Sequence, residues 1–137
     1  MEWVIPGRLA RARRPGYAKA PDGTKTVDRR QVPKWVQHVR ADGIRGVLCL
    51  LDAEELALYD SAEGGLFSYY RKHGLAVEHV PLQEHGRPDA AVLEQALAAY
   101  RRLPEPVVVH CSGGEGRTGA VVDFLRPRLG VAEAVRR

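Results

Sequence analysis

One stretch of the sequence carries residue types that could perform covalent chemistry on a phosphate group. It runs His110-Cys111-Ser112-Gly113-Gly114-Glu115-Gly116-Arg117-Thr118. Small residues between Cys111 and Arg117 would let backbone N–H groups converge on one point, and a following helix would add about half a positive charge at its N-terminus. The guanidinium of Arg117 offers a planar fork that fits two phosphate oxygens. The stretch therefore predicts a binding site for a phosphate dianion.

Cys111 would face a phosphate bound in this loop. A free thiol is only about 3% ionised at neutral pH, but a helix N-terminus and a nearby arginine favour the nucleophilic thiolate. We expect Cys111 to attack phosphorus while Arg117 binds the phosphoryl group. We also expect Thr118 to donate its hydroxyl to the sulfur, and His110 to fix the loop by hydrogen bonds and to favour the thiolate. The other expected phosphate-binding positions are Ser112, Gly113, Gly114, Glu115 and Gly116.

The hydrophobic pattern predicts the elements that would position this loop. The β-branched run 106–110 favours a buried strand just before it, and residues 118–125 favour a helix after it. Further strands are expected at 3–7, 44–51 and 75–82, and helices around 32–39, within 54–73 and at 89–103. This alternation indicates a single α/β domain over residues 1–137, with a central, mostly parallel sheet flanked by helices. Ligands bind beyond the carboxyl ends of the strands in such sheets, which is where the loop lies.

Two remaining regions carry weaker signals. Residues 11–27 are rich in Arg, Pro, Gly, Ala and Lys and favour a loop with a turn at Asp22-Gly23. The net charge is +4, and basic residues gather near both ends, at Arg8, Arg11, Arg13 and Arg14 and at Arg126, Arg128, Arg136 and Arg137. Such a balance suits anionic partners, although a solvated, arginine-rich surface explains it equally well.

Composition also excludes several classes of protein. Two cysteines are too few for a disulfide framework, and they do not form a Cys-x-x-Cys zinc pattern. No apolar run approaches the roughly 20 residues that span a membrane. The start lacks the basic and apolar regions of a signal peptide, so we expect a cytoplasmic protein. We also expect a monomer without membrane partner, metal or cofactor. Cys49 lies inside an apolar strand, where a core role is favoured over a redox partnership with Cys111.

The segment from His110 to Thr118 resembles His-Cys-x-x-Gly-x-x-Arg-Thr, the signature of the protein tyrosine phosphatase superfamily. Residues 3–10 and 81–88 are similar to segments of small atypical dual-specificity phosphatases of bacterial and archaeal type. The resemblance implies the cysteine-phosphatase fold and hydrolysis of phosphotyrosine, with phosphoserine or phosphothreonine as further substrates, through a cysteinyl-phosphate. The substrate would be a phosphorylated protein or a small phosphate ester.

The resemblance also implies a general acid. Residues 81–88 match Pro-x-x-Asp-His-Gly-x-Pro, in which the Asp protonates the leaving oxygen and later activates water. Glu84 stands at the Asp position and is longer by one methylene, and a misplacement of about 1 Å can cost a hundredfold in rate. Asp89 is the alternative acid, although a helix cap is its other natural role. We favour Glu84.

Two other functions stay open at this point. One is an RNA 5′-triphosphatase, which some relatives are, although nucleic acid is not the partner we expect. The other is a phosphate-binding module with little turnover, which the Glu84 substitution would suit. Relatives continue after Arg136 with a helix that carries a Gln near the hydrolytic water, whereas the sequence given ends at Arg137. The acidic Glu115 would repel polyanionic lipid head groups, which argues against a phosphoinositide phosphatase.

Overall fold

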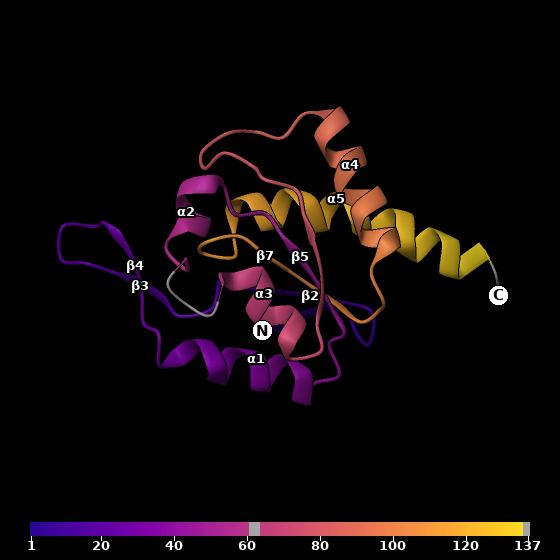
Figure 1. The fold of residues 1–137 in the computed structure, drawn as a ribbon. Coiled ribbons are helices and arrows are strands. Elements are labelled where there is room, and N and C mark those ends of the chain that lie inside the picture. Colours follow the sequence, from indigo (N-terminus) through magenta and orange to yellow (C-terminus); the bar gives the residue numbers. More distant parts are fainter. Residues whose placement is uncertain (61–63, 136–137) are drawn as a thin grey trace.

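Strand β7 (Val107–His110) lies at the centre of a five-stranded sheet and is buried along its whole length. The computed structural model describes residues 1–60 and 64–135, with side chains described as far as Leu129. The strand order is β1 (Glu2–Ile5), β2 (Leu9–Ala12), β7, β5 (Gly46–Cys49) and β6 (Ala76–His79). Only β1 runs antiparallel to its neighbour, which confirms the expected α/β fold with a mostly parallel sheet (Figure 1).

Helices cover both faces of this sheet (Figure 1). Helices α1 (Gln31–Ala41) and α3 (Leu66–Lys72) pack on one face, against Val47 and Val108. Helices α4 (Ala90–Arg102) and α5 (Gly116–Val135) pack on the other face, against alternate residues of the same strands. Successive side chains of a strand point to opposite faces, so strands that are buried along their whole length, such as β5 and β7, supply both cores at once.

The element boundaries follow from local sequence. Gly43 has φ of 92° and ends α1, as expected of a helix stop in the left-handed region. The side chain of Asp89 accepts a hydrogen bond from the Val92 N–H and caps α4. A capping box starts the short helix α2 (Ala53–Ala57): Asp52 accepts from the Glu55 N–H, and Glu55 accepts from the Asp52 N–H.

The helix expected within 54–73 is present as α3, with Leu66 and Tyr70 buried, and α2 is a second, short helix in the same segment. Residues 61–63 of that segment lie outside the described residues. One expectation about the elements is wrong. Residues 11–27, expected as a loop, include the end of β2 and a hairpin of β3 (Tyr17–Lys19) and β4 (Lys25–Val27). Strands this short, with charged residues in them, give little alternation to detect. The expected turn at Asp22-Gly23 is present, and the Thr24 N–H donates to Asp22 Oδ1 at 2.9 Å.

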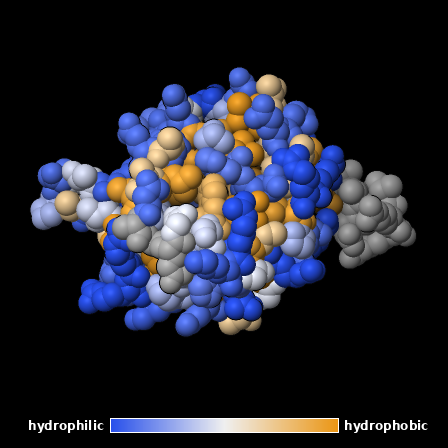
Figure 2. Space-filling view, viewed as in Figure 1, coloured by the Kyte–Doolittle hydropathy of each residue, from blue (hydrophilic) through white to orange (hydrophobic). Residues whose placement is uncertain are grey.

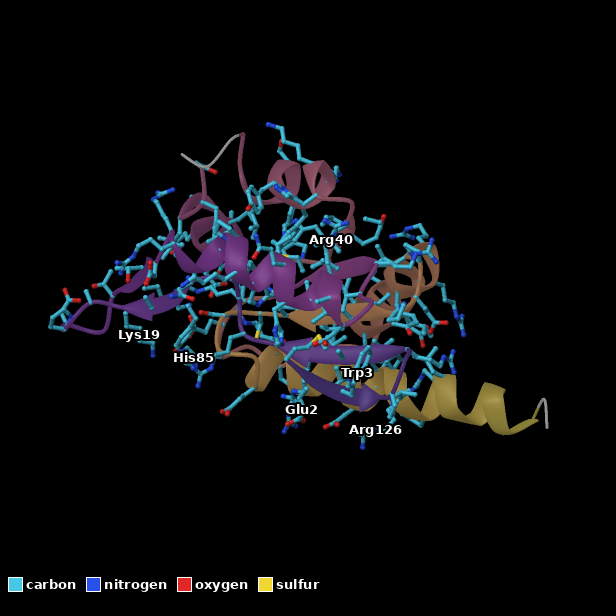
Figure 3. All side chains as sticks on the ribbon, turned by 90° about the horizontal axis from the view of Figure 1, so that it is seen from below. Glu2, Trp3, Lys19, Arg40, His85 and Arg126 are labelled. Atoms are coloured by element: carbon cyan, nitrogen blue, oxygen red, sulfur yellow. The ribbon has the colours of Figure 1, made fainter. Side chains whose placement is uncertain are left out.

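The hairpin β3–β4 projects from one end of the molecule (Figure 1). Its tip is largely hydrophilic in the space-filling view (Figure 2). In the view from below, Lys19 of this hairpin and His85 lie at the same end, far from Arg126 of α5 (Figure 3). The hairpin and the loop around His85 therefore approach each other at one edge of the sheet. Within the described residues, no helix combines the length and hydropathy needed to cross a membrane.

Candidate active site

The loop after β7 forms the floor of a cavity of about 520 Å³. Cys111 follows the last residue of β7 and is 2% exposed, and α5 begins at Gly116, so Arg117 lies in the first turn of the helix. The cavity is lined by Cys111, by Arg117 and by Glu84 from the segment after β6. The remaining expected loop residues in its lining are Ser112, Gly113, Glu115 and Gly116. The topology thus brings the two sequence-predicted segments, 81–88 and 110–118, to one place.

The backbone of the loop is held from the side of β2. Gly114 has φ of 81°, and a Cβ there would lie 2.8 Å from the Ala12 carbonyl oxygen, so a side chain does not fit. Arg11 donates from Nη2 to the Gly114 carbonyl at 2.7 Å and to the Glu115 carbonyl at 3.3 Å. These bonds fix the curve of the loop from a side chain that does not line the cavity.

Arg14 connects the loop to the hairpin. It is 1% exposed, and its Nε donates to Ser112 Oγ at 3.0 Å. Its Nη2 donates to the Ala18 and Thr26 carbonyl oxygens at 3.0 and 2.7 Å, one in each strand of the hairpin. Arg14 of the basic N-terminal cluster is therefore a structural residue. It neither faces solvent nor lines the cavity.

His110 is buried and neutral. Burial lowers its pKa to about 4. Its Nδ1 lies 3.2 Å from the Cys111 carbonyl oxygen, which only accepts, so Nδ1 carries the hydrogen and Nε2 accepts from the Tyr70 hydroxyl at 2.8 Å. The ring thus contacts the backbone at the start of the loop, and the role expected of it stays a prediction. A neutral ring carries no charge with which to favour a thiolate at Cys111.

Thr118 is fully buried in the first turn of α5. Its hydroxyl oxygen has no hydrogen-bond partner among the described residues, so the expected bond to the Cys111 sulfur is not made in this structure. A buried hydroxyl without a partner is costly. The role expected of Thr118 stays a prediction.

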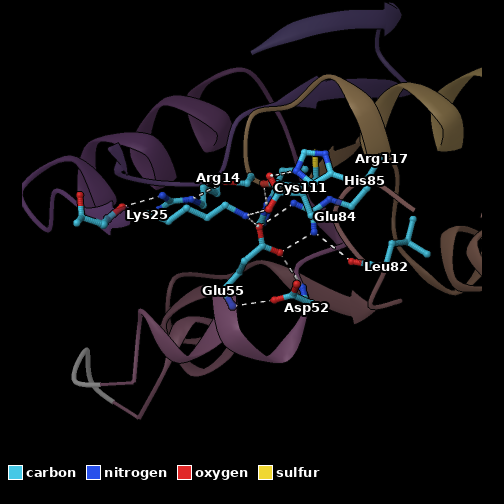
Figure 4. Close-up of polar contacts among 12 residues, drawn as sticks. Arg14, Lys25, Asp52, Glu55, Leu82, Glu84, His85, Cys111 and Arg117 are labelled. Carbon is cyan, nitrogen blue, oxygen red and sulfur yellow. Dashed lines mark hydrogen bonds and ion pairs between the residues drawn. The ribbon is translucent and has the colours of Figure 1, made fainter. Parts of the chain in front are cut away.

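Arg117 is held by a buried carboxylate that the sequence analysis did not single out. Nη1 and Nη2 of Arg117 donate to Oε1 and Oε2 of Glu55 at 2.6 and 2.7 Å, and Nη1 also donates to the Leu82 carbonyl oxygen at 3.1 Å (Figure 4). Burial by itself would raise the pKa of Glu55, but hydrogen bonds from Arg117 and Lys25 outweigh it and lower the pKa to about 2. Glu55 is therefore ionised at any physiological pH.

Lys25 of strand β4 joins this pair to the expected general acid. Its Nζ donates to Glu55 Oε2 at 2.6 Å and also to Glu84 Oε2 (Figure 4). The hydrogen bond from Lys25 is the main reason that the pKa of Glu84 lies below its ordinary value. His85, 89% exposed, places Nε2 3.6 Å from Glu84 Oε1. The carboxylate of Glu84 thus lies at the mouth of the cavity, in contact with the hairpin.

The other candidates are used elsewhere. Asp89 accepts a hydrogen bond from the Val92 N–H on Oδ1 at 2.9 Å and does not line the cavity of Cys111. Cys49 is fully buried in β5, and burial raises its pKa to about 12, so it is a protonated core thiol. Within the described part of the chain, no cluster of three or more His, Cys, Asp or Glu is placed to hold a metal ion.

The sequence analysis did not identify four residues as part of the site, namely Arg11, Arg14, Lys25 and Glu55. Each lies between 30 and 103 residues from a partner with which it bonds. The Asp52-x-x-Glu55 pattern signals a capping box and could have marked the start of α2. It carries no information about Arg117, because that contact depends on the order of strands in the sheet.

The chain is similar in sequence to one protein family and to several curated proteins. A family model described as "Polymorphic toxin system, DSP-PTPase phosphatase" matches residues 23–126, which include Glu84, Cys111 and Arg117. Cyclin-dependent kinase inhibitor 3 from Rattus norvegicus is 27% identical over 130 residues, and its Homo sapiens counterpart is 28% identical over 133 residues. Each match covers 91% of this chain but 59% of the relative, so the chain spans little more than half the length of these relatives.

Solved structures share the fold. Tk-PTP in its active form matches with a TM-score of 0.63 at 25% identity, covering 93% of this chain and 73% of that chain. Kinase associated phosphatase (KAP), solved with a serine in place of its catalytic-site cysteine, matches with a TM-score of 0.58 at 20% identity, covering 85% and 64%. At its lower identity, KAP shows a likeness of fold alone.

Proposed function

The chain belongs to the polymorphic toxin system DSP-PTPase phosphatase family, and from this premise we propose that it hydrolyses phosphate monoesters, phosphotyrosine above all, through a covalent phosphate on Cys111. The resemblance to small dual-specificity phosphatases of the protein tyrosine phosphatase superfamily is confirmed. The activity, the residues that perform it and the substrate are proposals.

The first step transfers the phosphoryl group to the enzyme. The substrate phosphate lies against the loop N–H groups, the N-terminus of α5 and the guanidinium of Arg117. The Cys111 sulfur forms a bond to phosphorus while the bond from phosphorus to the leaving oxygen breaks, and Glu84 gives that oxygen its proton. In the second step the ionised Glu84 removes a proton from water, which attacks the cysteinyl-phosphate and frees the thiolate and inorganic phosphate.

The observation that carries this proposal is one cavity lined by all three reacting side chains. Cys111 lies at its floor, and Arg117 and Glu84 lie in its walls. Arg117 is buried and oriented at two points by Glu55, so it needs little rearrangement to receive an anion. A phosphate-binding module would need Arg117 but would have no use for a carboxyl group facing the same space.

The substrates that fit this chemistry are phosphorylated proteins, with phosphoserine and phosphothreonine admitted beside phosphotyrosine, or small phosphate esters. A cytoplasmic monomer remains our prediction.

The test is metal-free hydrolysis of para-nitrophenyl phosphate by the wild type and by Cys111→Ser. We expect turnover in the presence of a chelator for the wild type and none for the variant, which should still bind tungstate. Activity that survives Cys111→Ser contradicts the proposal. Release of phosphate from triphosphate-ended RNA, faster than from a phosphotyrosine peptide, would favour the RNA 5′-triphosphatase instead.

A further inference from the structure

Lys25 lies between two carboxylates that serve different parts of the site. It donates to Glu55 Oε2 at 2.6 Å, and Glu55 in turn orients Arg117. It also donates to Glu84, the expected general acid. Its side chain is 22% exposed and lines the same cavity as Cys111. One hairpin residue therefore contacts both Glu55, which orients Arg117, and Glu84, the expected general acid.

The contact with Lys25 opposes the first catalytic duty of Glu84. A carboxylate that accepts a hydrogen bond from an ammonium is stabilised in its ionised form. An ionised Glu84 cannot give a proton to a leaving oxygen, yet the first chemical step requires that proton. The second step, which needs an ionised base, is favoured by the same contact. The free site is thus arranged for the end of the catalytic cycle and must change before the cycle begins.

We propose that Lys25 is a positioning residue that keeps Glu84 ionised in the free site and releases it when a phosphoryl dianion enters the Cys111 loop. The hairpin β3–β4 would then couple the arrival of substrate to the readiness of the acid. This inference rests on the function proposed above and deepens it, because it adds a control on the same site.

The charges around the cavity explain why a dianion would have this effect. The phosphoryl group brings two negative charges into the space that Lys25 already faces, so it competes with Glu84 for the ammonium. It also disfavours a second anion nearby, which promotes protonation of Glu84. The proton comes from solvent on binding and passes to the leaving oxygen in the first step, while Lys25 keeps its own protons throughout.

Other charged groups near Glu84 cannot replace Lys25. His85 lies on the same segment and is 89% exposed. Arg117 from α5 is bonded to Glu55 and to the Leu82 carbonyl, and Glu55 from α2 carries the same charge as Glu84. The main cause that lowers the pKa of Glu84 is the hydrogen bond from Lys25. Removal of this ammonium should therefore have a larger effect on Glu84 than removal of any neighbour.

The hairpin offers a matched control for Lys25. Lys19 is its direct cross-strand partner and lines the same cavity. Its Nζ lies 6.0 Å from the centre of the Tyr17 ring, and within the described residues no ion pair with a carboxylate involves it. Lys19→Met removes the same charge from the same hairpin without removing the contact with Glu84.

The experiment follows the Glu84 carboxyl group by NMR during a pH titration of the folded protein. Lys25→Met should move its titration to higher pH, Lys25→Arg should restore the wild-type midpoint, and Lys19→Met should leave it in place. Tungstate bound to the wild type should also move the midpoint upward, and this part needs no hairpin variant. In turnover of phenyl phosphate, the basic limb of the kcat/KM profile should move to higher pH in Lys25→Met.

Each negative result has one meaning. The inference is wrong if the midpoint of the Glu84 titration is unchanged in Lys25→Met, or if it moves equally in Lys19→Met. It is also wrong if tungstate does not change the midpoint in the wild type. These readouts do not depend on turnover. Loss of the proposed function would instead appear as wild-type protein without phosphatase activity, or as activity that persists in Cys111→Ser.

Discussion

Arg117 and Glu55 meet edge to edge, with the terminal nitrogens of the guanidinium on the two oxygens of the carboxylate at 2.6 and 2.7 Å. Nη1 uses its second N–H on the Leu82 carbonyl. An arginine has five N–H groups, so one on Nε and one on Nη2 remain. These two form the side edge of the guanidinium, which can bind two phosphate oxygens at once. Glu55 thus orients Arg117 without using the edge that a phosphate needs.

The first prediction concerns Glu55. Glu55→Gln keeps the shape but leaves one acceptor oxygen and no charge, so Arg117 is less firmly oriented. A hydrogen bond to a charged group contributes about 1.5–3 kcal/mol, which corresponds to about a tenfold to hundredfold rise in the Kd for tungstate and in KM. Calorimetry and steady-state kinetics measure these. Glu54→Gln, on the exposed neighbour in α2, is the control and should leave both values unchanged.

The second prediction concerns the guanidinium of Arg117. Arg117→Lys preserves the charge but removes both the two-point contact with Glu55 and the two-point contact with phosphate. Loss of a donor to a developing anion commonly costs about 10²–10³ in kcat, so we expect a loss of at least about a hundredfold in kcat/KM. Near-normal turnover of para-nitrophenyl phosphate by this variant would mean that Arg117 does not bind the phosphoryl group.

The third prediction is a dependence of stability on pH. Burial holds the pKa of His110 at about 4, below its ordinary 6.5, so the unfolded chain binds a proton first and stability falls as pH drops from 6.5 to 4. Glu55 has a pKa of about 2 against an ordinary 4.5, so its contribution is complete above 4.5 and is lost as pH falls toward 2.

Urea unfolding at a series of pH values measures both windows. Glu55→Gln has no carboxyl group to titrate at this position, so its curve should flatten between pH 4.5 and 2 while the decline between 6.5 and 4 persists. A wild-type stability that stays constant from pH 6.5 to 4 would show that His110 is not held neutral in the folded protein.

The sequence sufficed where chemistry and structure are both local. Cys111 and Arg117 are six positions apart in one loop, and a β-branched strand and a helix flank them, so the anion site could be predicted together with its place at the end of a strand. Asp89 could likewise be assigned as a cap, because a cap bonds within its own first turn.

The supports of the site could not be predicted in this way. Glu55 is 62 positions from Arg117, and Arg14 is 98 positions from Ser112. Both contacts exist because β2 and β5 lie on either side of β7, a topology that periodicity does not specify. Strand β2 itself was missed, since its residues Leu-Ala-Arg-Ala are not β-branched although the strand lies inside the sheet, between β1 and β7.

The last prediction identifies the acid through the leaving group. General acid catalysis contributes about 10²–10⁴ in rate and matters most when the leaving oxygen is basic. Glu84→Gln should therefore slow phosphotyrosine hydrolysis by a factor in this range, slow an activated aryl phosphate much less, and flatten the basic limb of the pH–rate profile. Glu84→Asp tests the extra methylene, and should retain activity if the segment 82–88 can move the shorter carboxyl into reach.

Asp89→Asn is the matched control for this assignment. Asn caps a helix about as well as Asp, so α4 should keep its stability, and the charge is removed without disturbing the fold. If Glu84 is the acid, the Asp89→Asn variant hydrolyses activated and unactivated esters at the same relative rates as the wild type. If instead Asp89→Asn loses phosphotyrosine turnover while Glu84→Gln keeps it, the proton comes from Asp89, and the contact between Lys25 and Glu84 then has no part in controlling the acid.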